Sequence, residues 1–197
     1  MTHWYTADPH FGHDAILRLC RRPFRTAGHM DAVLMARLRE AVGAEDDLWV
    51  LGDLAFGPKA KDESWLRRLF DQLPGARRHL VAGNHDGPAT LALPWDTVTP
   101  MAEVQDGPGR PAVLCHYPLL TWPGARRGAL HLFGHVHGNW PGSRGAVNVG
   151  VDCWEYRPVA LPEIATRAAA LPPSPLWETV EPGAGDAPPV TAAAGAG

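Results

Sequence analysis

Residues 79–86 read HLVAGNHD, a short apolar run that ends in a glycine and three polar side chains. Such runs, rich in Val, Leu and aromatic residues, are typical of buried strands. The pattern recurs in four other stretches, HWYTAD (3–8), LWVLGD (48–53), AVLCH (112–116) and LHLFGH (130–135). Ligands of open α/β sheets bind outside the carboxyl ends of the strands. Five such strands would therefore deliver their polar residues to one edge.

The spacing of apolar residues between these strands predicts helices over about 14–20, 29–42 and 60–73. Strands that alternate with helices indicate βαβ units. From about residue 98 the expected strands are joined by short Gly- and Pro-rich links, which favours a more antiparallel sheet. A last helix is expected at 161–170. We therefore predict an α/β fold with two facing mixed β-sheets flanked by helices.

The chain has 197 residues, the size of one domain with a full hydrophobic core. We expect residues 1–171 to form that domain. Residues 172–197 are dominated by Pro, Gly and Ala, a composition that buries little surface and predicts a flexible tail. Trp177 is the largest apolar side chain of this segment, and its docking on the domain is the alternative to a loose tail.

Composition limits the possible partners. A formal charge of −3 gives no evident surface for duplex nucleic acid, since non-specific duplex binding requires a basic one. Three cysteines without CxxC spacing argue against a disulfide framework and favour a reducing, cytoplasmic location. The chain shows neither a signal-peptide pattern nor an apolar run of eighteen residues, so no membrane association is expected. The sequence does not indicate an oligomeric state.

The polar residues that close the strands are good metal ligands. His nitrogen combined with Asp and Asn oxygen suits Mn, Fe, Zn or Ni, and Mn is the ion we expect to work in vitro. A catalytic zinc keeps only three protein ligands, so the larger set here predicts two divalent ions, roughly 3.5–4 Å apart, that share one carboxylate. The seven candidates are Asp8, His10, Asp53, Asn84, His116, His135 and His137.

The order of these clusters resembles the metallophosphoesterase (calcineurin-like phosphoesterase) superfamily, whose motifs are DxH, GD, GNH[D/E], H and GHxH. Five separated motifs in order are far more specific than any single one. The chain is most similar to the small bacterial and phage-type branch over residues 3–165, which implies an αββα sandwich. The stretches that carry this closer likeness are 8–13, 22–24, 116–118, 148–152, Trp154 and 156–159.

The resemblance implies a role for each candidate ligand. Asp53 bridges the two ions, with a hydroxide or water between them. That hydroxide attacks phosphorus in line. The other ligands divide into a first-metal set of Asp8, His10 and His137 and a second-metal set of Asn84, His116 and His135.

Two further residues of the GNHD motif have implied catalytic roles. His85 faces the substrate, stabilises the phosphoryl charge and can protonate the leaving oxygen. Asp86 is expected to hold the His85 ring, because a carboxylate fixes the tautomer and orientation of an imidazole. Three residues outside the metal set are candidates for substrate contacts: His13, Arg22 and Asn139. Capping of the following helix would explain His13 equally, and pairing with a helix dipole is the favoured explanation of Arg22.

The expected activity is hydrolysis of a phosphate ester, with a small phosphate ester or a nucleotide as the substrate. Two divalent ions, two carboxylates and one hydroxide leave about one positive charge, which suits a singly charged phosphodiester. A phosphomonoesterase or nuclease on the same site is the alternative, and a catalytically silent scaffold is an alternative of another class. A Ser/Thr protein phosphatase is disfavoured, because this chain reads GDLAFG and GNHD where those relatives have GDxxDRG and GNHE.

Overall fold

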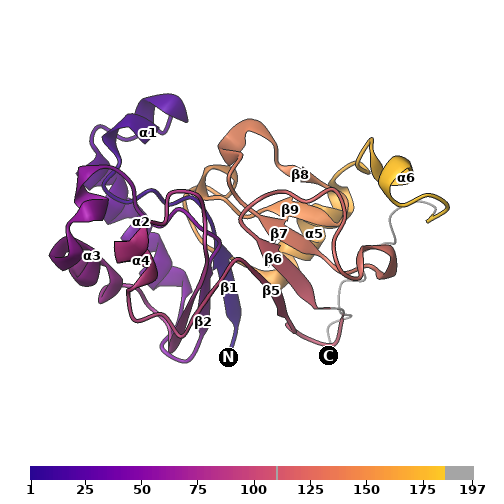
Figure 1. Cartoon of the computed structure of the whole chain (residues 1–197), viewed down its shortest axis with the longest axis horizontal. Coiled ribbons are helices and arrows are strands. Elements are labelled where there is room, and N and C mark those ends of the chain that lie inside the picture. The colour runs from indigo at the N-terminus through magenta and orange to yellow at the C-terminus, as the bar shows by residue number, and fades with distance from the viewer. Residues whose placement is uncertain (110, 185–197) are drawn as a thin grey trace.

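Two five-stranded sheets form the centre of the molecule, with helices outside them (Figure 1). A computed structural model describes residues 1–109 and 111–184 of the chain. The first sheet has the order β10 (Val159–Ala160), β1 (His3–Thr6), β2 (Asp47–Val50), β3 (Arg77–Val81) and β4 (Thr97–Thr99). The second has the order β5 (Met101–Val104), β6 (Ala112–Cys115), β7 (His131–Phe133), β9 (Ala146–Asn148) and β8 (Gly142–Ser143). The predicted pair of mixed sheets is confirmed.

Strand directions differ in part from the prediction. β1 to β4 run parallel, as βαβ units require, and β10 adds an antiparallel edge. In the second sheet only the edge strands β5 and β8 are antiparallel, whereas β6, β7 and β9 run parallel. The expected antiparallel character is therefore wrong for the centre of this sheet. Residues 116–130, which connect β6 to β7, are long enough for a parallel crossover. They contain no α-helix, whose apolar periodicity would have indicated the crossover in the sequence.

The main core lies between the sheets and α5 (Leu161–Ala170). Tyr5 of β1 and Leu51, which follows β2, belong to one apolar cluster with Leu132 of β7 and Val147 of β9. Ile164 of α5 packs into the same cluster. All five side chains are fully buried. Burial of apolar surface contributes about 25 cal/mol per Å² to stability. This apolar contact therefore holds the two sheets in a fixed relation. The strand ends of both sheets are therefore held in place relative to one another.

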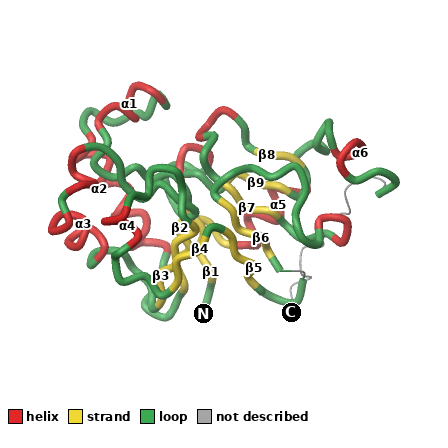
Figure 2. Tube along the Cα trace, in the orientation of Figure 1, coloured by secondary structure: helices red, strands yellow, loops and turns green. Residues whose placement is uncertain are grey.

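Helices α1 (Asp14–Leu19), α2 (Ala27–Ala41), α3 (Glu63–Phe70) and α4 (Pro88–Leu91) lie on the other side of the first sheet (Figure 2). Leu34 of α2 and Leu66 of α3 pack against Leu48 of β2 in a second apolar cluster. Asp14 lies in the first turn of α1 and accepts from Ala27 N. Within the described residues, no helix has both the length and the apolar character needed to cross a bilayer.

Part of the segment expected to be loose is packed. α6 (Trp177–Val180) holds Trp177 in a third apolar cluster, where its side chain is only 5% exposed. The Trp122 ring lies 6.2 Å from it between centroids. Trp177 is therefore docked on the domain, as in the alternative expectation. Of the tail expected at 172–197, residues 185–197 lie outside the described residues.

Candidate metal centre

The candidate ligands follow the carboxyl ends of strands from both sheets. Asp8 follows β1, Asp53 follows β2 and Asn84 follows β3, while His116 and His135 follow β6 and β7. In Figure 1 the N-terminus lies at the foot of β1, so these strand ends point towards α1. The placement predicted from the sequence is therefore the one that the structure has.

Glycines of the motifs make room for the site. A Cβ on Gly52 would lie 2.3 Å from His116 Nδ1, and Gly52 has a φ of +85°. A Cβ on Gly134 would lie 2.5 Å from Asp8 Oδ2. Side chains at these positions would therefore displace a candidate ligand.

The ligands themselves have an unusual backbone conformation. Eight non-glycine residues have a positive φ in the described part of the chain, and five of them are candidate ligands. Such left-handed conformations cost of order 1 kcal/mol or more and persist where the surrounding structure imposes them. Their concentration here marks a functional site. The five are Asp8, His10, Asp53, His135 and His137.

Asp8, His10 and His137 form the first group. Each offers one ligand atom, and the three atoms lie within 4.8 Å of one another. His10 and His137 have ring centroids 5.1 Å apart. Asp8 is fully buried and accepts from His135 N at 2.8 Å, which ties this group to the GHxH loop.

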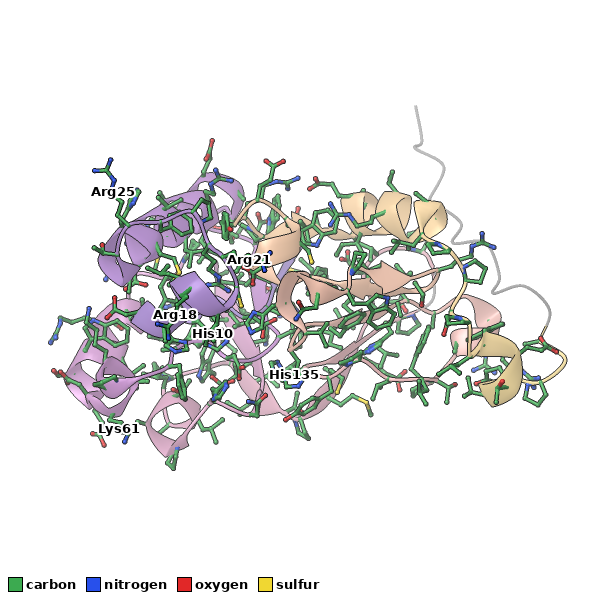
Figure 3. All side chains as sticks on the ribbon, turned by 90° about the horizontal axis from the view of Figure 1, so that it is seen from above. His10, Arg18, Arg21, Arg25, Lys61 and His135 are labelled. Carbon is green, nitrogen blue, oxygen red and sulfur yellow. The ribbon has the colours of Figure 1, made fainter. Side chains whose placement is uncertain are left out.

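The second group surrounds Asp53. Asp8, Asp53 and His116 also offer three atoms within 4.8 Å, so the two groups share Asp8. His116 Nε2 lies 3.6 Å from Asp53 Oδ2 and 3.1 Å from Asn84 Oδ1. The rings of His116 and His135 have centroids 5.2 Å apart. All seven predicted ligands are thus brought into one centre, labelled in part in Figure 3.

Buried atoms of the centre fit divalent cations. His10 Nε2 has no hydrogen-bond partner in the described structure, yet it is buried and lies 3.5 Å from Asp53 Oδ2. Burial lowers the pKa of His10 to about 2, so the ring is neutral, the form that binds a metal. Burial raises the pKa of Asp8 to about 8. A nearby cation would favour its carboxylate form.

Behind the centre, Asp152 and Arg22 fix the first group. His137 Nδ1 lies 3.0 Å from Asp152 Oδ2, which leaves Nε2 as the ligand atom. Arg22 is 4% exposed and donates to both Asp152 oxygens and to the backbone oxygens of Asp8 and Pro9. The prediction that Arg22 contacts substrate is therefore wrong. Its donors are used within the protein.

Asp86 also differs from the prediction. Its carboxylate accepts from the backbone N–H groups of Asp53, Leu54 and Gly83, at 2.8–3.0 Å. These bonds occupy both oxygens, and none joins Asp86 to the His85 ring in the described structure. Burial raises the pKa of Asp86, an effect that the three N–H donors oppose. Asp86 therefore anchors the loop that carries Asp53.

His85 lies at the rim of the centre. Its backbone N–H donates to Asp53 Oδ1 at 2.8 Å, and its Nε2 lies 4.0 Å from Asp53 Oδ2. The side chain is 36% exposed, and its ring contacts Phe56 with centroids 4.2 Å apart. His85 is thus held at the centre while remaining open to solvent.

The other substrate candidates lie beside the centre. His13 Nδ1 is 3.3 Å from His10 Nδ1, and Asn139 ends the short 3₁₀ helix η3 (His137–Asn139) as an exposed residue. Sequence reasoning missed Cys20, whose sulfur lies within 4.8 Å of ligand atoms of His137 and Asp152. No motif marks Cys20, since the turn after α1 places it there.

Comparisons with known proteins show relatives of similar size. No protein-family model matches the chain. The Gene 66 proteins of Mycobacterium phages D29 and L5 are 29% and 27% identical, each over 77% of this chain and 88% and 86% of the phage proteins. A protein of unknown function from Aquifex aeolicus has a crystal structure with a TM-score of 0.67 and 26% identity, covering 84% of this chain and 98% of that one.

A more distant likeness is to the Pseudomonas putida nuclease MPE, at 27% identity and a TM-score of 0.40 over 68% of this chain and 61% of that one. A TM-score this low adds nothing to the assignment. The Aquifex likeness shows the fold, two mixed sheets flanked by helices. Asp and His clusters able to hold metal lie at the strand ends, as the resemblance to metallophosphoesterases implies.

Proposed function

We propose that the chain is a phosphoesterase that uses two divalent metal ions and hydrolyses phosphodiesters. The observation that carries the proposal is the convergence of the seven ligands around two buried carboxylates, Asp8 and Asp53. Asp8, His10 and His137 would hold one ion, and His116, Asn84 and His135 the other, with Asp53 between them. When bound, the ions would lower the pKa of a coordinated water and neutralise charge on the phosphate.

The protein's own residues supply orientation. His116 Nδ1 lies 2.8 Å from Leu51 O, which directs Nε2 into the centre. Asp152 does the same for His137. Because these partners are fixed by the fold, little reorganisation is needed when substrate binds.

His85 is the group placed to act on the leaving oxygen. It is the GNHD histidine at the rim, fixed through its backbone to Asp53 and open to solvent. A protonated ring there can stabilise the phosphoryl oxygens and then transfer its proton. General acid catalysis of this kind contributes about 10²–10⁴ in rate.

The preference for diesters follows from charge. Two divalent ions carry four positive charges, of which Asp8 and Asp53 offset two. A hydroxide nucleophile reduces the remainder to about one, which matches one singly charged diester. Mn is the ion proposed for assays, because the nitrogen and oxygen ligand set suits it.

Hydrolysis of bis-(p-nitrophenyl) phosphate in Mn²⁺ tests the proposal. We expect turnover that a chelator abolishes and added Mn²⁺ restores, with a kcat/KM higher than for p-nitrophenyl phosphate. His85→Ala should lower kcat by about 10²-fold or more while metal content stays unchanged. A protein that takes up no metal, or takes it up and hydrolyses neither ester, would contradict the proposal.

A further inference from the structure

Residues 11–30 differ in charge from the rest of the chain. They contain four arginines and one aspartate, a net charge of +3 with His neutral, whereas the whole chain carries −3. Arg22 is buried against Asp152. The other three arginines are exposed, and in the described structure none of their guanidinium groups has an ion pair or hydrogen bond within the protein. We refer to these three, Arg18, Arg21 and Arg25, as the arginine rim.

A surface depression lies between Arg21, one residue of the arginine rim, and the candidate metal centre. It has a volume of about 360 Å³ and lies between Leu19, Cys20 and Arg21 on one side and His137, Gly138 and Asn139 on the other. Because His137 is a candidate ligand, the depression opens directly beside the centre. In Figure 3, seen from above, Arg18 and Arg21 overlie the part of the molecule that holds His10.

The conformation of Arg21 is imposed by the turn after α1. Its φ is +53°, in the left-handed region, and its backbone N–H donates to Arg18 O at 3.4 Å. Arg22, which follows it, is locked in place by Asp152. The turn thus fixes the position of the Arg21 backbone next to the depression. Within the described residues, neither a hydrogen bond nor an ion pair holds its guanidinium group.

The second group of ligands borders a different kind of surface. Tyr117 is 43% exposed, and its ring centroid lies 5.0 Å from that of His116 and 4.7 Å from that of His135. Leu120, in the same loop, is 60% exposed. An aromatic face and an apolar side chain are therefore available to a flat ring bound near the centre.

We propose that this surface binds single-stranded nucleic acid, with a phosphate next to the scissile one on Arg21 and Arg18 and a base on Tyr117. The inference rests on the proposed function and names its substrate class. Unpaired guanidinium groups together with an exposed aromatic ring, here on two sides of one centre, are the combination by which proteins hold single strands. A duplex would present no free base to Tyr117. A small cyclic diester would have no second phosphate for the arginine rim.

Binding is measured by fluorescence anisotropy with the full chain loaded with Mn²⁺. The probe is a labelled ten-residue oligothymidylate with phosphorothioate linkages, which slow cleavage. The Arg18→Glu/Arg21→Glu double variant should bind at least tenfold more weakly than the unmodified chain. Its salt dependence should also be shallower by about one unit of slope for each lost phosphate contact.

Two further variants keep the test specific. Arg18→Ala/Arg21→Ala should also weaken binding of the probe, as the double Glu variant does. Tyr117→Ala should weaken it by roughly fivefold or more. The matched control is Arg127→Glu. Arg127 is exposed on the 3₁₀ helix η2 (Ala125–Arg127). Ala125 of this helix packs in one cluster with Trp177 of α6. Figure 1 shows α6 at the opposite end of the molecule from α1, so η2 lies away from the arginine rim. This control should bind the probe as the unmodified chain does.

The inference is overturned if the unmodified chain does not bind the probe at 50 mM salt, if Arg127→Glu weakens binding as much as the double variant, or if a duplex of the same length binds more tightly. Probe binding without hydrolysis of any phosphate ester would contradict the proposed function and leave this surface standing. Hydrolysis of bis-(p-nitrophenyl) phosphate without probe binding would support the proposed function and contradict the nucleic-acid surface.

Discussion

His10 Nε2 lies 3.5 Å from Asp53 Oδ2, buried and without a hydrogen bond between the two atoms. The separation is set by the main chain, because His10 N donates to Asp53 O at 3.1 Å and Asp8 N to Gly52 O at 3.1 Å. These bonds continue the pairing of β1 and β2 beyond the strands. A buried imidazole nitrogen left without a partner is costly. A cation between the two side chains would satisfy both.

Gly83 tests the packing around Asp53. A Cβ there would lie 2.4 Å from Asp53 Oδ1 and 2.7 Å from Asp53 N. Gly83→Ala should displace this carboxylate, cost about 1–3 kcal/mol of stability and lower metal content. The control is Gly87→Ala, where nothing lies within 4 Å and φ is −75°, so stability should change by less than about 0.5 kcal/mol. Thermal denaturation and elemental analysis give both readouts, and equal effects would refute this packing.

Asp152 is expected to position His137 without binding metal itself. Asp152→Asn removes the charge that orients His137 and pairs with Arg22. The affinity for Mn²⁺, measured by calorimetric titration, should fall about 10–100-fold. Asp71→Asn is the control, because Asp71 is exposed and pairs only with exposed Arg67 in the described structure. An unchanged affinity in Asp152→Asn would show that the hydrogen bond has no positioning role.

His131 should make stability depend on pH. Burial lowers its pKa to about 4, against the opposing effect of bonds to Val113 O and Tyr117 O. The unfolded chain, with a His pKa near 6.5, then binds more protons than the folded one between pH 4 and 6.5. Stability contributed by the neutral ring is complete above pH 6.5 and falls as the pH drops towards 4, by about 3 kcal/mol at most.

The check is denaturant unfolding at several pH values for the unmodified chain and His131→Gln. The difference in unfolding free energy between the two proteins should change across this window, because Gln does not titrate. A constant difference from pH 4 to pH 7 would mean that His131 is protonated in the folded state as readily as in the unfolded one.

Trp177 should anchor the C-terminal part of the described chain. It is 5% exposed in a cluster with Trp122 and Phe133. Trp177→Ala should cost about 3 kcal/mol or more if that segment unfolds together with the domain. The neighbouring Leu176 is 46% exposed, so Leu176→Ala should cost less than about 0.5 kcal/mol. Comparable losses in urea denaturation would contradict the docking of α6.

The ligand positions could be predicted because each ends or closely follows a strand. An apolar run followed by Gly and a polar residue encodes both the strand and its carboxyl end, as at Gly52 and Gly83. Helix α5 has the bounds predicted from the sequence, and a Pro stands in its first turn, where helices tolerate it. Local patterns therefore carried the prediction of where the site lies.

What could not be predicted depends on contacts between distant segments. Arg22 and Asp152 lie 130 positions apart, and nothing near Arg22 reveals that its donors are used within the protein. Asp86 takes its partners from the Asp53 loop, which a local pattern cannot specify. The parallel crossover from β6 to β7 runs through loop and 3₁₀ helix, so no helical periodicity marked it.

The number of metal ions per chain is the most direct test of the centre itself. The protein is stripped with a chelator, reconstituted with Mn²⁺, freed of excess ion and measured by elemental analysis. We expect about two ions per chain. Asp53→Asn should retain at most about one, since Asp53 Oδ2 lies 3.5 Å from His10 Nε2 and 3.6 Å from His116 Nε2. A chain that retains no ion, or an Asp53→Asn variant that retains as many as the unmodified protein, would contradict the paired-cation centre.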